Sequence, residues 1–354
     1  MAAVPRTLVL ESPRHLSFEE RPSRPLAPGE VRLRSVLSGI SHGTELSLYR
    51  GTSAFADKVF DRGLRAFVTP HAGSVHAYPV TLGYEMVSEV VEAAPDVTEV
   101  KVGDLVHTGT PHQDETVLDV AESLGTTYPL VVLPTAERMD RALFLSLAAV
   151  ALTAVHDAQI KLGDTVSVHG LGVIGLLTVQ MCTLEGIQTV IGVDPDPHRR
   201  ELAAGFGASS VVDPDGDLGP HIRSINSGRG VDVAIEVSGS DRGLQGALAA
   251  TGLGATVVAA GFYQGGAANL RLGEEFHHNR LTLIASAGGW GVPNRHAPLW
   301  DRRRVLGTAM RLLYTDRVSV EGMLDRRFRF DAAPEAYREL DQQPNGSVKS
   351  ALEY

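Results

Sequence analysis

Three glycines and one aspartate have the types and spacing that bind a dinucleotide. The glycines form a G-x-G-x-x-G motif, and the acid lies nineteen residues beyond the last of them: Gly170, Gly172, Gly175 and Asp194. Gly170 permits a tight turn, Gly172 lets the backbone approach a pyrophosphate, and Gly175 lets the next helix pack close to the preceding strand. The motif therefore predicts a turn that binds NAD or NADP.

The same motif favours NAD. Its helix begins with Val173 and Ile174, where the partial positive charge of the N-terminus attracts phosphates. The Asp194 carboxylate accepts hydrogen bonds from ribose hydroxyls and repels the 2′-phosphate of NADP. The alternative is NADP, because Arg199 and Arg200, which follow closely after His198, would hold that phosphate. We expect them to lie in the solvated first turn of the next helix.

These residues need a parallel sheet to position them. From Ser146 onward, short apolar runs alternate with helical segments, which is typical of a doubly wound parallel sheet of the Rossmann type. The predicted strands are Thr165–Val168, Thr189–Val193, Ser210–Val212, Val231–Val237, Thr256–Ala260 and Leu281–Ala285.

The preceding part of the chain has a different texture. Short alternating stretches such as Glu30–Val36 and Leu105–Thr108 are separated by Gly and Pro turns, which predicts a β-rich domain. Residues 52–80 lack periodicity and are predicted to form a long surface loop. The last part is similar to the first, with helices Arg302–Leu313 and Pro334–Gln342 and a closing strand Ser347–Glu353. We therefore predict a catalytic domain at 1–146 and 288–354 and a dinucleotide-binding domain at 147–287.

Composition narrows the class of protein. The net charge of −10 argues against a nucleic-acid or anionic-membrane partner. We find no apolar run of about 20 residues that would span a membrane, and no signal-peptide core near the N-terminus. A single cysteine, Cys182, excludes an internal disulfide and a metal site built from several cysteines. A cytoplasmic location is the default expectation.

Motifs outside the glycine turn extend this picture over nearly the whole chain. With the dinucleotide motif, the chain resembles the medium-chain dehydrogenase/reductase superfamily of alcohol-dehydrogenase-like proteins. The resemblance implies a GroES-like catalytic domain, a Rossmann domain, hydride transfer in the cleft between them, and a homodimer or homotetramer. The motifs that carry it are Pro28-Gly29-Glu30-Val31, Gly39-Ile40-Ser41-His42-Gly43-Thr44-Glu45, Leu82-Gly83-Tyr84-Glu85 and Val102-Gly103-Asp104-Leu105-Val106.

The chain departs from the zinc-dependent members of that superfamily. Where they carry the zinc ligands Cys, His and a further Cys or Glu, this chain has Ser41 (or His42), Tyr84 and approximately Ser146. Serine and tyrosine hydroxyls are poor zinc ligands, because catalytic zinc takes Cys, His or carboxylate. The four-cysteine structural zinc lobe is missing as well. We therefore expect no metal; a site rebuilt from His42, Glu45 and Glu85 is the alternative.

Hydride transfer to a carbonyl still needs a group that stabilises the developing charge on oxygen. Tyr84 is the candidate proton donor, and Ser41 is a candidate second donor or relay. For each, a purely structural hydroxyl is the alternative. His42 lies at the position of either a pyrophosphate contact or a metal ligand. Glu85, like Glu45, either orients these groups or forms a structural ion pair.

The resemblance also suggests contacts to cofactor and substrate. Alanines match backbone positions that hold the carboxamide, and a lysine matches a basic residue that reaches the pyrophosphate, unless it is simply an exposed charge. Two aromatic residues are candidate substrate contacts. Four further histidines are expected in loops or on the surface. The alanines are Ala260, Ala285 and Ala287, and the lysine is Lys349. The aromatic residues are Trp290 and Tyr78, and the histidines are His71, His112, His277 and His278.

Three functions compete. The leading one is an NAD-dependent, zinc-independent alcohol dehydrogenase or carbonyl reductase acting on a small or medium secondary alcohol or ketone, such as one of secondary metabolism. The second is a zinc-free enone or quinone reductase, which Asp194 disfavours because such enzymes mostly use NADPH. The third is a dinucleotide-binding sensor without catalysis. The Gly-Ile-Ser-x-Gly-Thr-Glu pattern is similar to the zinc-lacking bacteriochlorophyllide dehydrogenase branch and to bacterial proteins called zinc-binding alcohol dehydrogenases.

Overall fold

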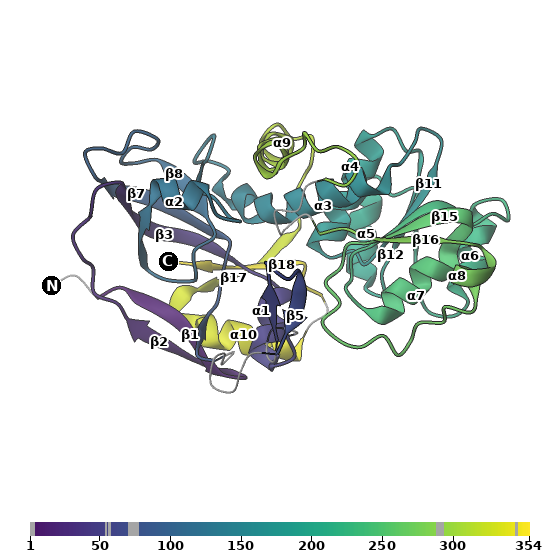
Figure 1. The fold of residues 1–354 in the computed structure, drawn as a ribbon, viewed down its shortest axis with the longest axis horizontal. Coiled ribbons are helices and arrows are strands. Elements are labelled where there is room, and N and C mark those ends of the chain that lie inside the picture. The colour runs from purple at the N-terminus through teal and green to yellow at the C-terminus, as the bar shows by residue number, and fades with distance from the viewer. Residues whose placement is uncertain (1–3, 54, 56–57, 70–77, 288–293, 344–345) are drawn as a thin grey trace. The chain divides into compact units, whose positions relative to one another are not determined.

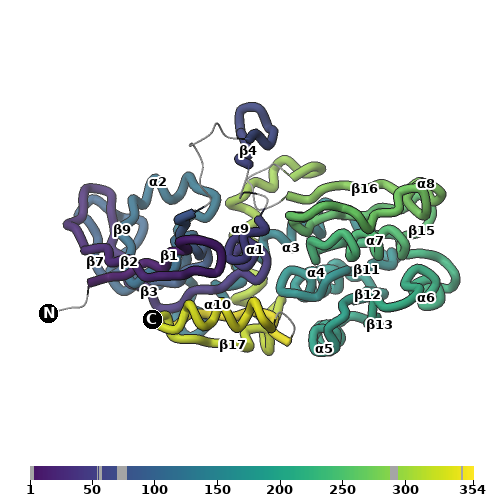
Figure 2. The backbone as a smooth tube through the Cα atoms, turned by 90° about the horizontal axis from the view of Figure 1, so that it is seen from below, coloured from purple at the N-terminus to yellow at the C-terminus, as the bar shows by residue number. Residues whose placement is uncertain are grey.

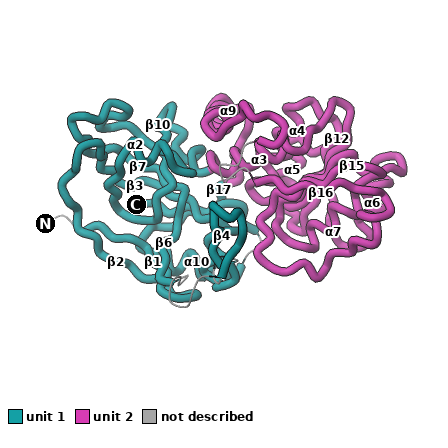
Figure 3. Tube along the Cα trace, in the orientation of Figure 1, with its two compact units in different colours: residues 1–143, 324–354 teal, residues 144–323 magenta. Residues whose placement is uncertain are grey.

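The computed structural model describes residues 4–53, 55, 58–69, 78–287, 294–343 and 346–354 (Figure 1). The chain divides into two compact units, which Figure 3 shows in separate colours. The first unit contains residues 1–143 and 324–354, and the second contains residues 144–323. The chain therefore enters the first unit, forms the second, and returns to the first.

The second unit contains the predicted doubly wound sheet. Its six strands are parallel and lie in the order β13-β12-β11-β14-β15-β16. Strand order reverses beside β11, where such folds bind their ligand at the carboxyl ends of the strands. This confirms the predicted α/β fold class. The strands are β11 (Thr165–His169), β12 (Thr189–Val193), β13 (Ser210–Val212), β14 (Val231–Glu236), β15 (Thr251–Ala259) and β16 (Thr282–Ala285).

Helices connect these strands and cover the sheet (Figure 2). Apolar side chains of α6, α7 and four of the strands form one buried cluster, which includes Ile222, Leu248 and Ala234. Burial of such side chains is the main driving force for assembling the layers. The helices are α3 (Leu145–Ala158), α4 (Val173–Leu184), α5 (Pro197–Gly205), α6 (Leu218–Ile225), α7 (Asp241–Ala250), α8 (Glu275–His278) and α9 (Arg302–Tyr314).

The first unit is built mainly from β-strands. A seven-stranded sheet has the order β10-β8-β7-β3-β18-β17, with β9 also paired to β3, and β2-β1-β6 form a second sheet. The strands of the large sheet are β3 (Glu30–Ile40), β7 (Met86–Ala93), β8 (Leu105–Thr108), β9 (Glu115–Asp119), β10 (Val131–Val132), β17 (Leu324–Arg329) and β18 (Lys349–Glu353). Those of the small sheet are β1 (Arg6–Ser12), β2 (His15–Glu20) and β6 (Val80–Thr81).

Short helices and a hairpin complete the first unit. Helix α1 (Thr44–Arg50) packs against α10 (Ala333–Gln342) over a core that includes Leu8, Ile40 and Tyr337. The described part of the predicted 52–80 loop is not irregular throughout, because it contains a β4–β5 hairpin in which Phe60 and Phe67 meet edge to face. The remaining elements are α2 (Val120–Leu124), β4 (Val59–Asp61), β5 (Ala66–Val68), η1 (Met139–Phe144) and η3 (Phe330–Ala332).

The boundaries between the units differ from those predicted at 146/147 and 287/288. Residues 294–323 belong with the second unit, since α9 packs against α3. The sequence analysis assigned this helix to the first domain with the rest of the last part of the chain, because a helical period shows that a helix forms but not which core it packs on.

One helical stretch corrects the prediction of no membrane-length apolar run. Residues Met139–Ala158 are long and apolar enough to cross a membrane, with a mean hydropathy of 1.4. In the structure 67% of the apolar 18-residue window within this stretch is buried, and α3 contributes many of the buried side chains. The core helix of a folded domain passes the same test of length and composition.

Candidate active site

The glycine-rich turn lies at the carboxyl end of β11, and each glycine has a different environment. Gly170 has φ +90°, and a Cβ added there would lie 2.7 Å from the backbone nitrogen of Ser238. A Cβ on Gly175 would overlap the carbonyl oxygen of Gly170, whereas one on Gly172 would meet no atom within 4 Å. The first and third glycines thus allow close packing. The second leaves open backbone at the N-terminus of α4, which suits a pyrophosphate.

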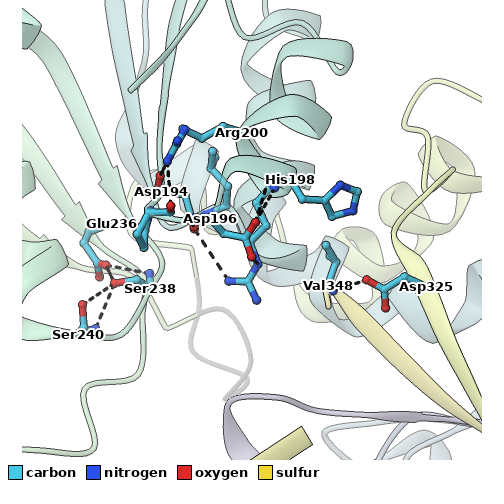
Figure 4. Close-up of polar contacts among 12 residues, drawn as sticks. Asp194, Asp196, His198, Arg200, Glu236, Ser238, Ser240, Asp325 and Val348 are labelled. Atoms are coloured by element: carbon cyan, nitrogen blue, oxygen red, sulfur yellow. Dashed lines mark hydrogen bonds and ion pairs between the residues drawn. The ribbon is translucent and has the colours of Figure 1, made fainter. Parts of the chain in front are cut away.

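Asp194 follows β12 and is tied to this turn. It is 4% exposed, and its Oδ2 accepts the N–H of Leu171 at 2.7 Å while Oδ1 accepts the N–H of Asp196 at 2.8 Å (Figure 4). Each carboxylate oxygen has a second lone pair, which remains for a ribose hydroxyl. The turn and the acid therefore form one preorganised arrangement that fits a dinucleotide.

The sequence predicts that the two arginines of α5 are solvated, but in the structure both lie against acidic groups. The Arg200 guanidinium donates to the Asp194 carbonyl oxygen at 2.6 Å and to the Asp213 carboxylate at 2.8 Å. An Arg199 nitrogen lies 4.0 Å from Asp194 and another lies 3.9 Å from Asp196. Acidic neighbours draw both guanidinium groups onto the protein surface because opposite charges attract.

A further loop, which the sequence analysis did not single out, borders the glycine turn. Glu236 ends β14, and its buried carboxylate accepts hydrogen bonds from the N–H and hydroxyl of Ser238 and from the hydroxyl of Tyr263 (Figure 4 draws the Ser238 contacts). Burial raises the pKa of Glu236 above its ordinary value. The available sequence signal was an acid at the end of an apolar strand, and the structure pairs it with His169 of β11.

The predicted carboxamide contacts lie at the same edge of this sheet. Ala260 follows β15, Ala285 ends β16, and Ala287 follows closely. Ala285 and Ala287 are exposed and Ala260 is half-buried, and the Ala260 N–H donates to the carbonyl oxygen of Glu236. Trp290, the predicted substrate contact, lies outside the described residues, as does His71.

In the first unit, Ser41 and Tyr84 lie side by side. Ser41 follows β3 and Tyr84 precedes β7, and these antiparallel neighbours pair Ser38 with Met86. The Tyr84 hydroxyl donates to the Ser41 Oγ at 2.8 Å, and the N–H of Thr44 donates to the same oxygen at 3.3 Å. Because Ser41 Oγ accepts from both, its own proton is available for another acceptor.

The phenol of Tyr84 is held in its protonated form. Burial, together with the charges of Glu85 and Glu45, raises its pKa well above the ordinary value. Its ring packs against that of Tyr128 in a tilted arrangement, with centroids 5.3 Å apart. The pair of Tyr84 and Ser41 is therefore a hydrogen-bond donor at neutral pH, which is what a developing oxyanion requires.

The other predicted residues of the first unit have structural partners. His42 is half-buried, and its Nε2 lies 3.2 Å from the Oγ of Ser350. The hydroxyl of Tyr78 donates to the carbonyl oxygen of Leu48 beside the core of this unit. His112, expected in a loop or on the surface, is in a loop but fully buried. His277 and His278 are exposed, as predicted.

Glu85 and Lys349 form a buried ion pair. Both side chains are nearly inaccessible, and the Lys349 ammonium donates to the Glu85 carboxylate and to the carbonyl oxygen of Ile40. Burial raises the pKa of Glu85 even beside this ammonium. Gly39 leaves the room for the pair, since a Cβ there would lie 2.9 Å from Lys349 Nζ. Lys349 thus has an internal partner, where the sequence predicts a pyrophosphate or solvent contact.

The Lys349→Met variant should therefore lose about 3–5 kcal/mol of unfolding free energy, because it leaves the Glu85 charge buried without a partner. Urea titration monitored by circular dichroism measures this loss. The matched control is Arg34→Met, which breaks the exposed pair with Glu89 and should cost no more than about 1 kcal/mol. Equal effects of the two substitutions would contradict the interpretation. Adding Glu85→Leu to Lys349→Met should restore part of the loss.

These groups do not fit a catalytic zinc ion. Within the described residues, no three His, Cys, Asp or Glu side chains lie close enough together to hold a metal. Ser41 and Tyr84 bond to each other, and Glu85 bonds to Lys349. Cys182 is buried in α4 of the other unit, where burial raises its thiol pKa to about 12. The chemistry of these donors is hydrogen bonding rather than metal ligation.

Comparison with known proteins gives the family. The chain matches the zinc-binding dehydrogenase family over residues 173–302 and the alcohol dehydrogenase GroES-like domain over residues 27–137. It is 31% identical to D-guloside 3-dehydrogenase of Escherichia coli, covering 99% of this chain and 100% of that protein. The chain belongs to the medium-chain dehydrogenase/reductase superfamily. It is an oxidoreductase of this type.

Further relatives agree on the fold. The chain is 31% identical to (R,R)-butanediol dehydrogenase of Bacillus subtilis over 72% of this chain and 75% of that protein. A crystal structure of a zinc-binding dehydrogenase of Sinorhizobium meliloti bound to NADP has a TM-score of 0.76 at 23% identity, with both chains fully covered. The solved butanediol dehydrogenase also has a TM-score of 0.76, at 22% identity and 99% coverage of both chains.

Proposed function

We propose that this protein is an NAD-dependent, zinc-independent dehydrogenase of a secondary alcohol, or the corresponding carbonyl reductase. The Tyr84–Ser41 hydrogen-bonded pair is the observation that carries this proposal, since the resemblance implies that both residues replace metal ligands of zinc-dependent members. The relatives named for guloside and butanediol support a polyol or sugar hydroxyl as the reacting group. Placement in secondary metabolism and in the bacteriochlorophyllide dehydrogenase-like branch stays a prediction.

The reaction moves one hydride and one proton. When bound, NAD supplies the carbon that accepts or gives the hydride. In the reducing direction the carbonyl carbon gains the hydride, and its oxygen becomes an alkoxide that takes a proton. Ser41 donates its hydroxyl proton to that oxygen, and the Tyr84 phenol, which donates to the Ser41 Oγ, replaces the proton through this hydrogen bond. The raised pKa of Tyr84 keeps the phenol proton in place until the more basic alkoxide forms.

The second unit supports the choice of NAD. Asp194 faces the glycine turn and keeps one acceptor position on each oxygen. A 2′-phosphate at this position would meet its negative charge at close range. His42 and Lys349 are not needed for binding in this proposal, because both have partners within the first unit.

Activity should survive removal of metal. We expect protein treated with EDTA and dialysed to oxidise methyl D-guloside or (R,R)-2,3-butanediol with NAD as fast as untreated protein, because its hydroxyl donors need no ion. Elemental analysis by mass spectrometry checks that zinc is absent. Activity that is lost on chelation and restored by Zn²⁺ would overturn the zinc-independent mechanism.

The assembly and location belong to the proposal as well. We propose a homodimer or homotetramer that acts in the cytoplasm on a small-molecule substrate, with no nucleic-acid or membrane partner. The acidic net charge of −10 and the superfamily resemblance support it. Sedimentation equilibrium of the purified protein tests the oligomeric state, and a monomer at micromolar concentration would contradict it.

A further inference from the structure

We propose that Glu45 and His112 form a clamp that fixes the two loops carrying Ser41 and Tyr84 against each other. The inference rests on the proposed function of that pair. Neither Glu45 nor His112 belongs to the hydroxyl pair itself. Both are positioning residues, and we call them the Glu45–His112 clamp.

The carboxylate of Glu45 holds the Ser41 loop. Glu45 lies in the first turn of α1 and is 1% exposed. Its Oε1 accepts the backbone N–H of Ser41 at 2.9 Å. The N–H of Thr44 then meets the Ser41 Oγ. These contacts set the direction of the Ser41 side chain, because both the backbone and the hydroxyl of the residue are anchored.

His112 holds the Tyr84 loop. Its backbone N–H donates to the carbonyl oxygen of Leu82 at 2.7 Å. A Cβ added to Gly83 would lie 2.7 Å from the nitrogen and 2.9 Å from the Cγ of His112, so the histidine occupies the space beside this glycine. Gly83 has φ +104°, a conformation that side chains rarely adopt. The residue before Tyr84 is therefore shaped to receive His112.

The two holding residues meet inside the first unit. His112 Nε2 lies 2.9 Å from Glu45 Oε2, and the Tyr337 hydroxyl donates to the same carboxylate. The Nδ1 of His112 lies 2.7 Å from the Oγ of Ser38. His112, Tyr337 and Ser38 are fully buried, so these bonds act in a medium of low dielectric and are strong. Positions 67 residues apart in sequence are thereby joined.

Geometry explains why this pairing matters for the hydroxyl pair. Glu45 uses one oxygen for the Ser41 loop and the other for His112 and Tyr337, and all of these groups donate. An amide in its place has no charge and turns a donor toward one of them, so Glu45→Gln weakens the contact on one side. A displacement of about 1 Å at a reacting group can lower a rate about 100-fold.

Hydrogen–deuterium exchange of the full-length protein tests the clamp directly. We expect Glu45→Gln to speed amide exchange about tenfold or more in residues 38–47 and also in residues 82–88. The second segment reports on the clamp, because Glu45 is linked to it through His112. His112→Asn should likewise loosen residues 38–47. The control Asp341→Asn removes the acid that pairs with Arg50 in the same unit and should leave both segments unchanged.

The cross-effect decides the proposal. If Glu45→Gln loosens only residues 38–47, or if Asp341→Asn loosens both segments equally, the clamp is wrong. Should Glu45→Gln fail to fold, Tyr337→Phe removes one donor from the carboxylate and should give a smaller cross-effect in the same two segments. No cross-effect in that variant would then overturn the clamp.

Kinetics separates the clamp from the proposed function. On a substrate that the wild type turns over, Glu45→Gln should lower kcat at least about tenfold while the Kd for NADH stays within about twofold. If Tyr84→Phe leaves kcat unchanged, the proposed function fails whatever the exchange data show. If Tyr84→Phe lowers kcat and Glu45→Gln does not, the clamp alone fails.

Discussion

Replacing Tyr84 with phenylalanine should lower kcat at least about tenfold, because a positioned proton donor contributes roughly 10²–10⁴-fold to the rate. The substitution removes the hydroxyl that donates to Ser41 and retains the ring that packs against Tyr128. Steady-state kinetics with NADH and the ketone of the active substrate measures the effect. The Kd for NADH, measured by fluorescence, should not change, because the glycine turn lies in the other unit.

Tyr128→Phe is the matched control for this experiment. It removes a phenol hydroxyl from the ring that packs on Tyr84 and leaves the Tyr84–Ser41 hydrogen bond in place. Its kcat should stay close to that of the wild type. Unchanged kinetics of Tyr84→Phe would remove Tyr84 from the mechanism, and an equal loss in both variants would point to packing rather than proton donation.

Asp194→Ala should shift the preference for NAD over NADP by about 100-fold, equal to roughly 2.7 kcal/mol, because it removes the charge that repels a 2′-phosphate. The substitution also removes a carboxylate that lies 4.0 Å from the Arg199 guanidinium, which favours a phosphate beside that arginine. The ratio of kcat/KM values for the two cofactors measures the preference.

Asp213→Asn controls for the loss of one negative charge near the arginines of α5. Asp213 pairs with Arg200 at 2.8 Å but makes no contact with the glycine turn among the interactions of the described residues. Its cofactor preference should remain that of the wild type. A preference that is the same in Asp194→Ala and the wild type would show that another group selects the cofactor.

The second unit was largely predictable because its central strands are buried on both faces. Such strands appear in sequence as continuous apolar runs, and Thr189–Val193 is found as predicted. The partly exposed edge strand Ser210–Val212 is found as predicted too. The glycine spacing located the turn for a similar reason. Each glycine is required by the local geometry of the backbone, so a few neighbouring residues are enough to recognise its role.

The first unit was less predictable because its elements are short and partly exposed. The sequence pattern did not reveal α1, which has only seven residues, or β9, which is half-buried along its length. The site depended on partners distant in sequence. His112 was expected in a loop or at the surface, and nothing in its neighbours indicates Glu45 or Tyr337 as contacts. Single-sequence patterns report periodicity, not such pairings.

The position of β18 has a consequence for the order in which the chain folds during synthesis. This strand lies between β3 and β17 inside the large sheet, although its residues Lys349–Glu353 leave the ribosome more than 300 residues after β3 begins. The second unit is complete at Met323, so it can fold while β3 still lacks a neighbour. Until β18 is made, β3 presents an unpaired edge over Leu37–Ile40, the kind of edge that can pair with another chain.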